Sequence, residues 1–134
     1  MRHGKLKYRL NRFSSWREAT VKSLARNILI YQSIKTTRNR SKAVRPLVEK
    51  LISLAKQNTL AAKRRAYDIL QDHALVSRLF KEIGPHFEKR PAGFTRIIGL
   101  SKRRGDSADM VIFELTEIKK VEKKKRVKEK EVKP

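Results

Sequence analysis

The sequence contains no cysteine, which excludes a disulfide framework, a thiolate metal site and a cysteine nucleophile. Glycine is scarce too, and with five in 134 residues there is neither a Gly-x-Gly-x-x-Gly run nor a Gly-x-x-x-x-Gly-Lys phosphate-binding loop. No apolar run approaches the roughly 18 residues that a membrane span requires. The basic N-terminus lacks the apolar segment of a secretory signal. We therefore expect a cytoplasmic protein with no membrane partner.

Acidic residues are also few, since 13 Asp and Glu stand against 35 Lys and Arg, a formal net charge of +22. A compact chain of that charge repels itself unless a partner supplies negative charge, and phosphate is the obvious source. Hydrophobic residues make up 39% of the sequence, which is enough to form a core. The composition therefore favours one folded domain that binds nucleic acid.

No pattern of residues in the sequence indicates catalysis. The three histidines, His3, His73 and His86, are far apart and lack the paired spacing of a zinc protease. The acidic residues are scattered, mostly beside Lys or Arg, where solvated pairing is their ordinary role. We expect no enzyme activity, no metal, no cofactor and no small-molecule substrate.

Residues 1–13 form a basic arm without any acidic residue, and a first helix is predicted to follow it. Ser15 and Glu18 have the spacing of a capping box, which satisfies backbone N–H groups at a helix start. Helical spacing continues along the apolar positions Val21, Leu24, Ala25, Ile28 and Tyr31. The segment Ser33–Thr37 is short, β-branched and alternating, so it predicts a brief strand.

A second helix carries the clearest apolar stripe in the sequence, and Thr37 is its predicted N-cap. The stripe consists of Val44, Leu47, Val48, Leu51, Leu54 and Ala55. Pro46 leaves two readings, because proline is tolerated in the first turn of a helix but costs ~3 kcal/mol in its interior. The helix either begins near Arg45 or is kinked there, and we favour a single helix from about Arg38.

Two further helices are predicted before the pattern changes. Thr59 can cap a third helix that carries Leu60, Tyr67 and Leu70, and Asp72 can cap a fourth. The fourth helix has a second apolar stripe, formed by Leu75, Val76, Leu79, Phe80 and Ile83. Gly84 and Pro85 are the residue types expected just past the end of such a helix.

Beyond a loop at residues 91–93 the apolar period changes from 3.6 to 2. This change predicts two strands, at residues 94–103 and 109–118, joined by a turn at Gly105 and Asp106. Val111, Phe113 and Leu115 share one face of the second strand. The order α-β-α-α-α-β-β predicts an α/β (α+β) domain of two layers, in which helices cover one face of a small mixed sheet.

The apolar pattern stops near residue 119. We therefore divide the chain into the basic arm (1–13), a single α/β domain (14–118) and a Lys/Glu-rich tail (119–134), which is disordered or a solvated helix in the free protein. Without the nine Lys and Arg and three Glu of the tail, 26 basic and 10 acidic residues remain, a net charge of +16. The folded domain itself is therefore basic.

The basic residues gather where the arm, a strand-to-helix corner and a hairpin tip are predicted. Neutralising about 6–10 phosphates at such places gives strong, salt-dependent binding. Thr36 and Thr37 add hydroxyl groups beside a helix N-terminus, which is itself a favourable place for phosphate. The predicted contacts are Arg2, His3, Lys5, Lys7, Arg9 and Arg12 in the arm, Lys35, Thr36, Thr37, Arg38, Arg40 and Lys42 at the corner, and Lys102, Arg103 and Arg104 at the hairpin.

Three aromatic residues, Tyr8, Phe13 and Trp16, flank the arm. They have the chemistry to stack on unpaired bases, as aromatic residues of RNA-binding proteins do. Phe13 and Trp16 also straddle the predicted capping box, where they could instead pack the helix start against the core. The sequence leaves both readings open.

Several segments, taken in order, resemble the family of the seventeenth protein of the bacterial large ribosomal subunit. Each piece is short, but together they cover residues 1–118 without a large gap. The matching segments are Met1-Arg2-His3, Leu10-Asn11-Arg12, Ser14-Ser15, Ile34-Lys35-Thr36-Thr37, Arg45-Pro46, Glu49-Lys50-Leu51-Ile52, Leu54-Ala55-Lys56, Arg90-Pro91-Ala92-Gly93-Phe94-Thr95-Arg96-Ile97 and Arg103-Arg104-Gly105-Asp106.

The resemblance implies a structural, non-catalytic constituent of the large ribosomal subunit, on the side of the peptide exit tunnel, in a cytoplasmic or organellar ribosome. Its implied partners are 23S-type rRNA and neighbouring ribosomal proteins, and Arg96 joins the expected RNA contacts. The sequence departs from the family in the bulky Phe13 and Trp16 and in the tail. Charge alone leaves two alternatives open, a DNA-compacting architectural protein and a scaffold whose tail recruits a protein partner.

Overall fold

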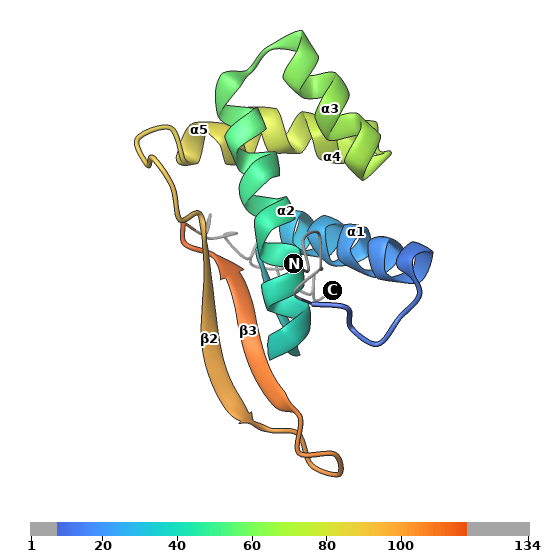
Figure 1. Ribbon diagram of the computed structural model, residues 1–134. Helices are drawn as coiled ribbons and strands as arrows, with labels where there is room; N and C mark the ends of the chain where they lie inside the picture. Colours follow the sequence, from blue (N-terminus) through green and yellow to red (C-terminus); the bar gives the residue numbers. More distant parts are fainter. Residues whose placement is uncertain (1–7, 118–134) are drawn as a thin grey trace, which may run out of the picture.

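The computed structural model describes residues 8–117 and shows helices packed on one side of a small sheet (Figure 1). The second half of the predicted arm and the whole predicted domain except Ile118 fall within this range, and the tail does not. In chain order the elements are α1 (Ser14–Tyr31), β1 (Ser33–Thr37), α2 (Arg38–Gln57), α3 (Leu60–Leu70), α4 (His73–Arg78), the π-helical segment η1 (Leu79–Ile83), α5 (Gly84–His86), β2 (Thr95–Lys102) and β3 (Asp109–Leu115). Because α4, η1 and α5 follow one another without a break, the observed order confirms the predicted one.

The three strands form an antiparallel sheet in the order β1-β3-β2. The prediction of a mixed sheet was wrong, because β1 pairs with β3 and runs opposite to it, while β2 and β3 form a hairpin. Phe113 in the central strand lies opposite Ile34 on one side and Ile97 on the other, and these side chains face the helical layer. The hairpin continues well beyond the helices (Figure 1).

Helix α2 connects the sheet with the group of helices at the other end of the molecule. Its first half lies over the sheet, and its second half carries α3 and the α4–α5 segment, while α1 packs along its side (Figure 1). The predicted α2 stripe is buried except for the half-buried Leu47. The largest fully buried side chains of the core are Phe87, Phe94, Phe113, Ile28, Leu29, Leu51, Ile52, Leu70, Leu79 and Leu115.

The start of α1 differs from the prediction. The helix begins at Ser14 with Phe13 as N-cap, and no side chain caps it. The predicted capping box of Ser15 and Glu18 is wrong, because Ser15 already lies inside the first turn. A residue in that position no longer has the extended backbone that lets an N-cap side chain reach back to the helix N–H groups.

Two helices turn different residues toward the core than their spacing suggested. In α1 the buried residue near the C-terminus is Leu29, whereas Tyr31 is 68% exposed. In α3, Leu60 and Tyr67 are exposed, and the contact with the core is made through the small side chains of Ala62 and Ala66 together with Leu70. Alanines allow α3 to approach its neighbours closely, which leaves its larger side chains outside.

Local signals at the other helix starts were accurate. Helix α2 runs from Arg38 to Gln57 with Pro46 inside it, so the prediction of a single helix is confirmed. Thr59 Oγ1 accepts a hydrogen bond from the Ala62 N–H (3.1 Å), and Asp72 Oδ1 accepts from the N–H groups of Ala74 (2.8 Å) and Leu75 (3.3 Å). Thr37 occupies the N-cap position of α2, but its hydroxyl makes no capping hydrogen bond.

Gly84 does not end the fourth helix as predicted. Its backbone is helical, with φ of −51°, and the helical segment continues to His86. A Cβ at Gly84 would lie 3.2 Å from the Ala55 Cβ and 3.3 Å from the Ala55 carbonyl oxygen. The glycine therefore serves close packing of α5 against α2.

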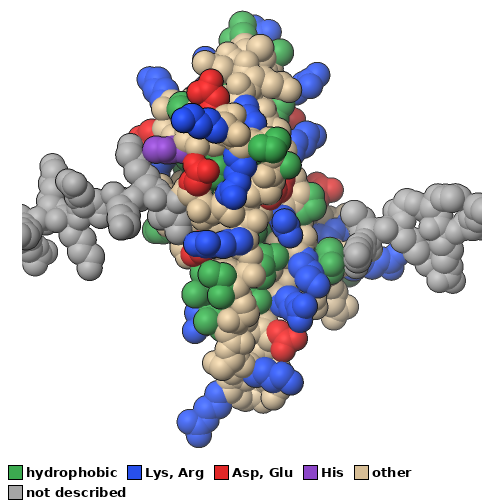
Figure 2. Space-filling model, turned by 90° about the vertical axis from the view of Figure 1, so that its left-hand side faces the viewer, with side chains coloured by type: hydrophobic (Ala, Val, Ile, Leu, Met, Phe, Trp, Pro, Cys, Tyr) green, Lys and Arg blue, Asp and Glu red, His purple; other side chains and the backbone are tan. Residues whose placement is uncertain are grey.

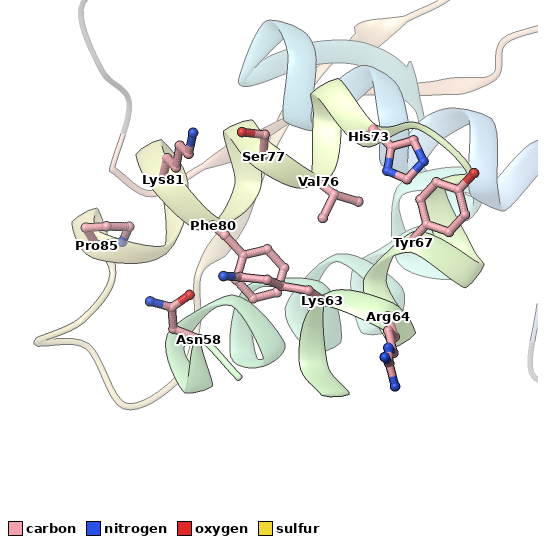
Figure 3. A pocket seen from close by; sticks show the side chains of 10 residues that line it. All are labelled: Asn58, Lys63, Arg64, Tyr67, His73, Val76, Ser77, Phe80, Lys81 and Pro85. Atoms are coloured by element: carbon pink, nitrogen blue, oxygen red, sulfur yellow. The ribbon is translucent and has the colours of Figure 1, made fainter. Parts of the chain in front are cut away.

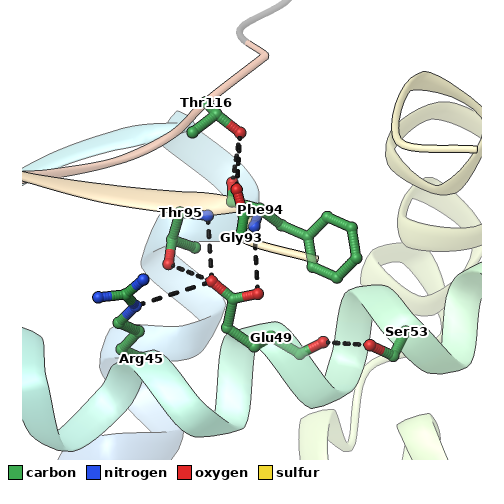
Figure 4. A network of polar contacts seen from close by, with 7 residues as sticks. All are labelled: Arg45, Glu49, Ser53, Gly93, Phe94, Thr95 and Thr116. Atoms are coloured by element: carbon green, nitrogen blue, oxygen red, sulfur yellow. Dashed lines mark hydrogen bonds and ion pairs between the residues drawn. The ribbon is translucent and has the colours of Figure 1, made fainter. Parts of the chain in front are cut away.

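A half-buried carboxylate fixes the start of the hairpin to α2 (Figure 4). Glu49 Oε2 accepts a hydrogen bond from the Phe94 N–H (3.1 Å), while Oε1 accepts from the Thr95 N–H (3.2 Å) and the Thr95 hydroxyl (2.7 Å). Arg45 lies 3.8 Å from the same carboxylate. These contacts set the position of β2 relative to the first half of α2.

Candidate nucleic-acid interface

The described part of the arm folds back onto the strand-to-helix corner. Leu10 and Asn11 have positive φ values of 56° and 50°, and the Arg12 N–H donates to the Arg9 carbonyl (3.3 Å), so the chain turns sharply here. A hollow of about 550 Å³ lies between this turn and the start of α2, and its lining includes Arg9 and Arg40. Three predicted contacts, Arg9 from the arm and Thr37 and Arg40 from the corner, thus lie at one site. Four others, Arg2, His3, Lys5 and Lys7, lie outside the described residues.

The N-terminus of α2 has the electrostatic character of an anion site. Its first turn contains no acidic residue, and the Thr37 side chain makes no capping hydrogen bond to the backbone N–H groups there. Arg38 and Arg40 are exposed, and Lys42 is half-buried. The helix dipole, the free N–H groups and these cations all favour a negatively charged ligand at this point.

A basic stripe on α2 extends this surface toward the hairpin. Arg38, Lys42 and Arg45 are spaced four and three residues apart, so they lie on one face of the helix. All three line a hollow of about 450 Å³ whose other wall is formed by β2 and β3 and includes Asp109. Arg45 was not among the predicted contacts, although helical spacing of the charges from Arg38 would have indicated it.

At the hairpin tip one predicted contact is already paired. Arg103 donates to both carboxylate oxygens of Asp106, at 3.0 Å from Nε and 2.5 Å from Nη2. This hydrogen-bonded contact holds the pKa of Asp106 at about 2, below its ordinary value, with help from the Ala108 N–H, and it raises the pKa of Arg103. Arg103 therefore stabilises the turn, whereas the exposed Lys102 and Arg104 make no ion pair with any described residue.

The remaining predicted contacts differ in their accessibility. Lys35 is exposed on the outer face of the sheet, but Thr36 is only 6% exposed and faces the core, so it has little surface for a ligand. Arg96 forms an ion pair with Glu114 on the neighbouring strand. The structure thus places Lys35 on the surface and gives Thr36 and Arg96 partners within the fold.

Positive charge is spread along the whole molecule. On the face drawn in Figure 2, Lys and Arg side chains extend from the helical end to the hairpin end, with isolated acidic side chains between them. Hollows lie between these charges at the arm, the corner and the α2 stripe. Two hollows lie there beside Arg40, and a third lies against Arg38.

Phe13 and Trp16 do not pack the helix start against the core. Their side chains are 78% and 64% exposed and contact each other edge to face, with ring centroids 6.0 Å apart and an interplanar angle of 85°. The second of the two readings from the sequence is therefore wrong. The stacking reading remains consistent with this exposure.

A separate hollow of about 710 Å³ lies at the helical end, between α3 and the α4–α5 segment (Figure 3). Tyr67 stacks on His73 at one side, with ring centroids 4.2 Å apart, and Lys63 lies over the Phe80 ring at 5.7 Å. Arg64 and Lys81 also line it. No contact predicted from the sequence lies in this hollow, because its residues come from two helices whose packing the sequence did not reveal.

Among residues 8–117 no group of three or more His, Asp or Glu is placed to hold a metal ion. None of the helices in that range is both long enough and apolar enough to cross a bilayer.

Comparisons with known proteins identify the family. The sequence profile described as ribosomal protein L17 matches residues 20–116. This chain belongs to the ribosomal protein L17 family. It is 47% identical over 117 residues to the large ribosomal subunit protein bL17 of Maridesulfovibrio salexigens, a match that covers 87% of this chain and 83% of that protein. It is 42% identical over 114 residues to the protein of the same name from Syntrophus aciditrophicus, which covers 85% and 91% of the two chains.

The L17 family assignment confirms the resemblance read from the sequence. The family consists of ribosomal components and not enzymes, so the expectation of no catalytic activity is confirmed by the family. The profile match begins at residue 20, after Arg12, Phe13 and Trp16. The L17 match therefore includes the corner, the α2 stripe and the hairpin, while the aromatic pair lies outside it.

Proposed function

We propose that this protein is a structural constituent of the large ribosomal subunit that binds 23S-type rRNA. The single observation that carries the proposal is the pair of basic hollows at the start of α2, where Arg9 and Arg40 line one side of the helix and Arg38, Lys42 and Arg45 line the other. The names of the relatives support the ribosomal part, since they are large ribosomal subunit proteins. Neighbouring ribosomal proteins are the further partners proposed.

The proposed mechanism is neutralisation of phosphates held in a particular shape. Each phosphate that a Lys or Arg neutralises releases counterions, so affinity falls steeply as salt rises. The α2 N-terminus and the hollows place these charges at fixed positions, which favours recognition of RNA shape over the reading of base edges. In this proposal residues 14–118 form the domain, residues 1–13 the RNA-binding arm, and residues 119–134 an appended tail.

Sedimentation of a cell lysate tests the ribosomal assignment. Tagged protein should migrate with the large subunit in near stoichiometric amount, and a high-salt wash should weaken the association. Migration as free protein, or with chromosomal DNA, would contradict the proposal and favour a DNA-compacting role. Removal of residues 119–134 should leave the association with the large subunit intact. If the truncated protein no longer associates with the subunit, the scaffold alternative is favoured.

A charge-matched pair of variants tests the binding surface. Replacing Arg9, Arg12 and Arg40 by alanine should weaken binding to a 23S-type rRNA transcript and reduce the salt slope by about 2, since each phosphate contact contributes about 0.7–0.9. The control removes the same charge at the helical end, at Lys63, Arg64 and Arg65. Equal losses in both variants would show that net charge, and not this surface, determines binding.

A further inference from the structure

Trp16 is a large apolar side chain that is left outside the core. It is the only tryptophan of the chain and is 64% exposed. A buried tryptophan removes about 150–250 Å² from water, so the exposed Trp16 ring and the neighbouring Phe13 ring offer apolar surface that a ligand can cover. Phe13 contacts the indole edge to face and thereby holds its orientation.

The indole forms one wall of a groove at the start of α1. The groove is shallow and has a volume of about 470 Å³. Its floor contains the small side chains of Ala19, Thr20 and Ser23, and Arg12 and Arg40 line it as well. Arg40 also lines the neighbouring hollow against the arm, so the groove is continuous with the proposed RNA-binding surface.

Hydrogen bonds fix the cation beside the indole. Arg12 Nη1 donates to Thr20 Oγ1 (2.6 Å), and the Thr20 hydroxyl in turn donates to the Trp16 carbonyl (2.7 Å). The guanidinium is therefore positioned and does not move freely in solvent. No acidic residue lines the groove, so its charge is complementary to an anion that also offers a flat aromatic face.

We propose that this groove binds one unpaired nucleotide of RNA, with its base stacked on Trp16 and its phosphate at Arg12 and Arg40. This inference rests on the proposed function and adds the kind of RNA element recognised. Stacking on an aromatic side chain combined with a nearby cation is the chemistry that proteins use for single strands. A base inside a duplex has both faces covered by its neighbours and cannot enter.

The intrinsic fluorescence of Trp16 reports on the groove directly. We would titrate the full-length protein with a single-stranded RNA of about 12 adenylates, a length within the usual range of single-strand sites, and with a duplex of the same length. Binding would be followed independently by the anisotropy of labelled RNA. The single strand should quench Trp16, and the duplex at equal saturation should not.

Variants separate stacking from charge. Trp16→Leu should weaken single-strand binding about 5- to 150-fold, the range for one stacked base, and leave duplex binding unchanged. Trp16→Phe should retain most of the affinity. Tyr31→Leu is the matched control, because Tyr31 is 68% exposed at the other end of the same helix and does not line the groove.

The outcomes distinguish this inference from the proposed function. Wild-type RNA binding with no change in Trp16→Leu, or quenching as strong with the duplex, would overturn the groove assignment and leave rRNA binding in place. Quenching by polyglutamate but not by RNA would assign the groove to an acidic peptide instead. Failure of the wild-type protein to bind either RNA would overturn both proposals.

Discussion

Replacing Glu49 by alanine should loosen the attachment of the hairpin to α2 and destabilise the whole domain. The carboxylate accepts hydrogen bonds from the N–H groups of Phe94 and Thr95 and from the Thr95 hydroxyl, at 2.7–3.2 Å. Phe94 and Thr95 are only 2% and 3% exposed. Water has little access to these donors once the carboxylate is removed.

The magnitude follows from the donors that lose their acceptor. A buried polar group left without a partner costs about 1–3 kcal/mol, and two backbone N–H groups are affected here. We therefore expect Glu49→Ala to lower the free energy of unfolding by about 2–5 kcal/mol, a large share of the 5–15 kcal/mol typical of a domain. At roughly 4 °C per kcal/mol for a chain of this size, Tm should fall by roughly 10–20 °C.

Urea and thermal unfolding followed by circular dichroism would measure this loss. Glu49→Gln keeps the shape of the side chain but turns an NH₂ group toward one of the donors, so its loss of stability should lie between those of the wild type and Glu49→Ala. Glu82→Ala is the matched control, because Glu82 pairs with Arg78 only at the surface (3.6 Å) and should change stability by less than about 0.5 kcal/mol. If Glu49→Ala were no more destabilising than Glu82→Ala, the reasoning from buried donors would be refuted.

Three further changes test other parts of the fold. Gly84→Ala places a methyl group 3.2 Å from the Ala55 Cβ, and the resulting overpacking should exceed the gain in helix propensity. Urea unfolding should show a net loss of about 1 kcal/mol, and a gain would contradict the close-packing role. Pro46→Ala restores an N–H inside α2 and should raise the free energy of unfolding by up to ~3 kcal/mol. An unchanged midpoint of urea unfolding would contradict this expectation. The pKa of Asp106 is about 2 in the folded protein, lowered from its ordinary 3.8. The stabilising contact with Arg103 is therefore fully present above pH 3.8 and is lost as the pH falls through about 2. NMR chemical shifts of the turn should titrate with a midpoint near pH 2, and Asp106→Asn should remove this titration. A midpoint near pH 4 would refute the pairing of Asp106 with Arg103.

The elements that the sequence predicted best are those determined by short-range contacts. The observed bounds of β1 match the prediction, and α2 begins at Arg38 as expected. Thr59 and Asp72 cap their own helices, because a cap needs only N–H groups two or three residues along the chain. Such features can be read from a few neighbouring residues.

The errors concern features that depend on a distant partner. Leu29 and Tyr31 both lie near the end of an amphipathic helix, and only the packing of α1 against α2 determines which one is buried. Gly84 has the sequence of a helix end, yet its conformation follows from close contact with Ala55. The antiparallel direction of β1 relative to β3 also depends on distant residues, because the path of the chain through the intervening helices determines how the two strands pair.

The candidate surface was predicted as a set of charges, but not as an arrangement. Counting Lys and Arg identified the arm and the corner, and the structure brings Arg9 beside Arg40. It also pairs Arg96 with Glu114 across two strands, a contact that requires the register of β2 and β3. The pairing of Arg103 with Asp106 spans only three residues and was within reach of the sequence.

Four of the acidic residues make contacts that hold the fold together, and their placement leaves most cations of this basic chain available. Glu49 holds the hairpin to α2, Asp72 caps α4, Asp106 closes the turn and Glu114 pairs across the sheet. Each neutralises at most one neighbouring cation, and none lines the hollows beside Arg40. The Arg side chains that line these hollows therefore stay available to a phosphate backbone, and RNA that binds only the folded state raises its stability with the logarithm of the ratio of free RNA concentration to the dissociation constant.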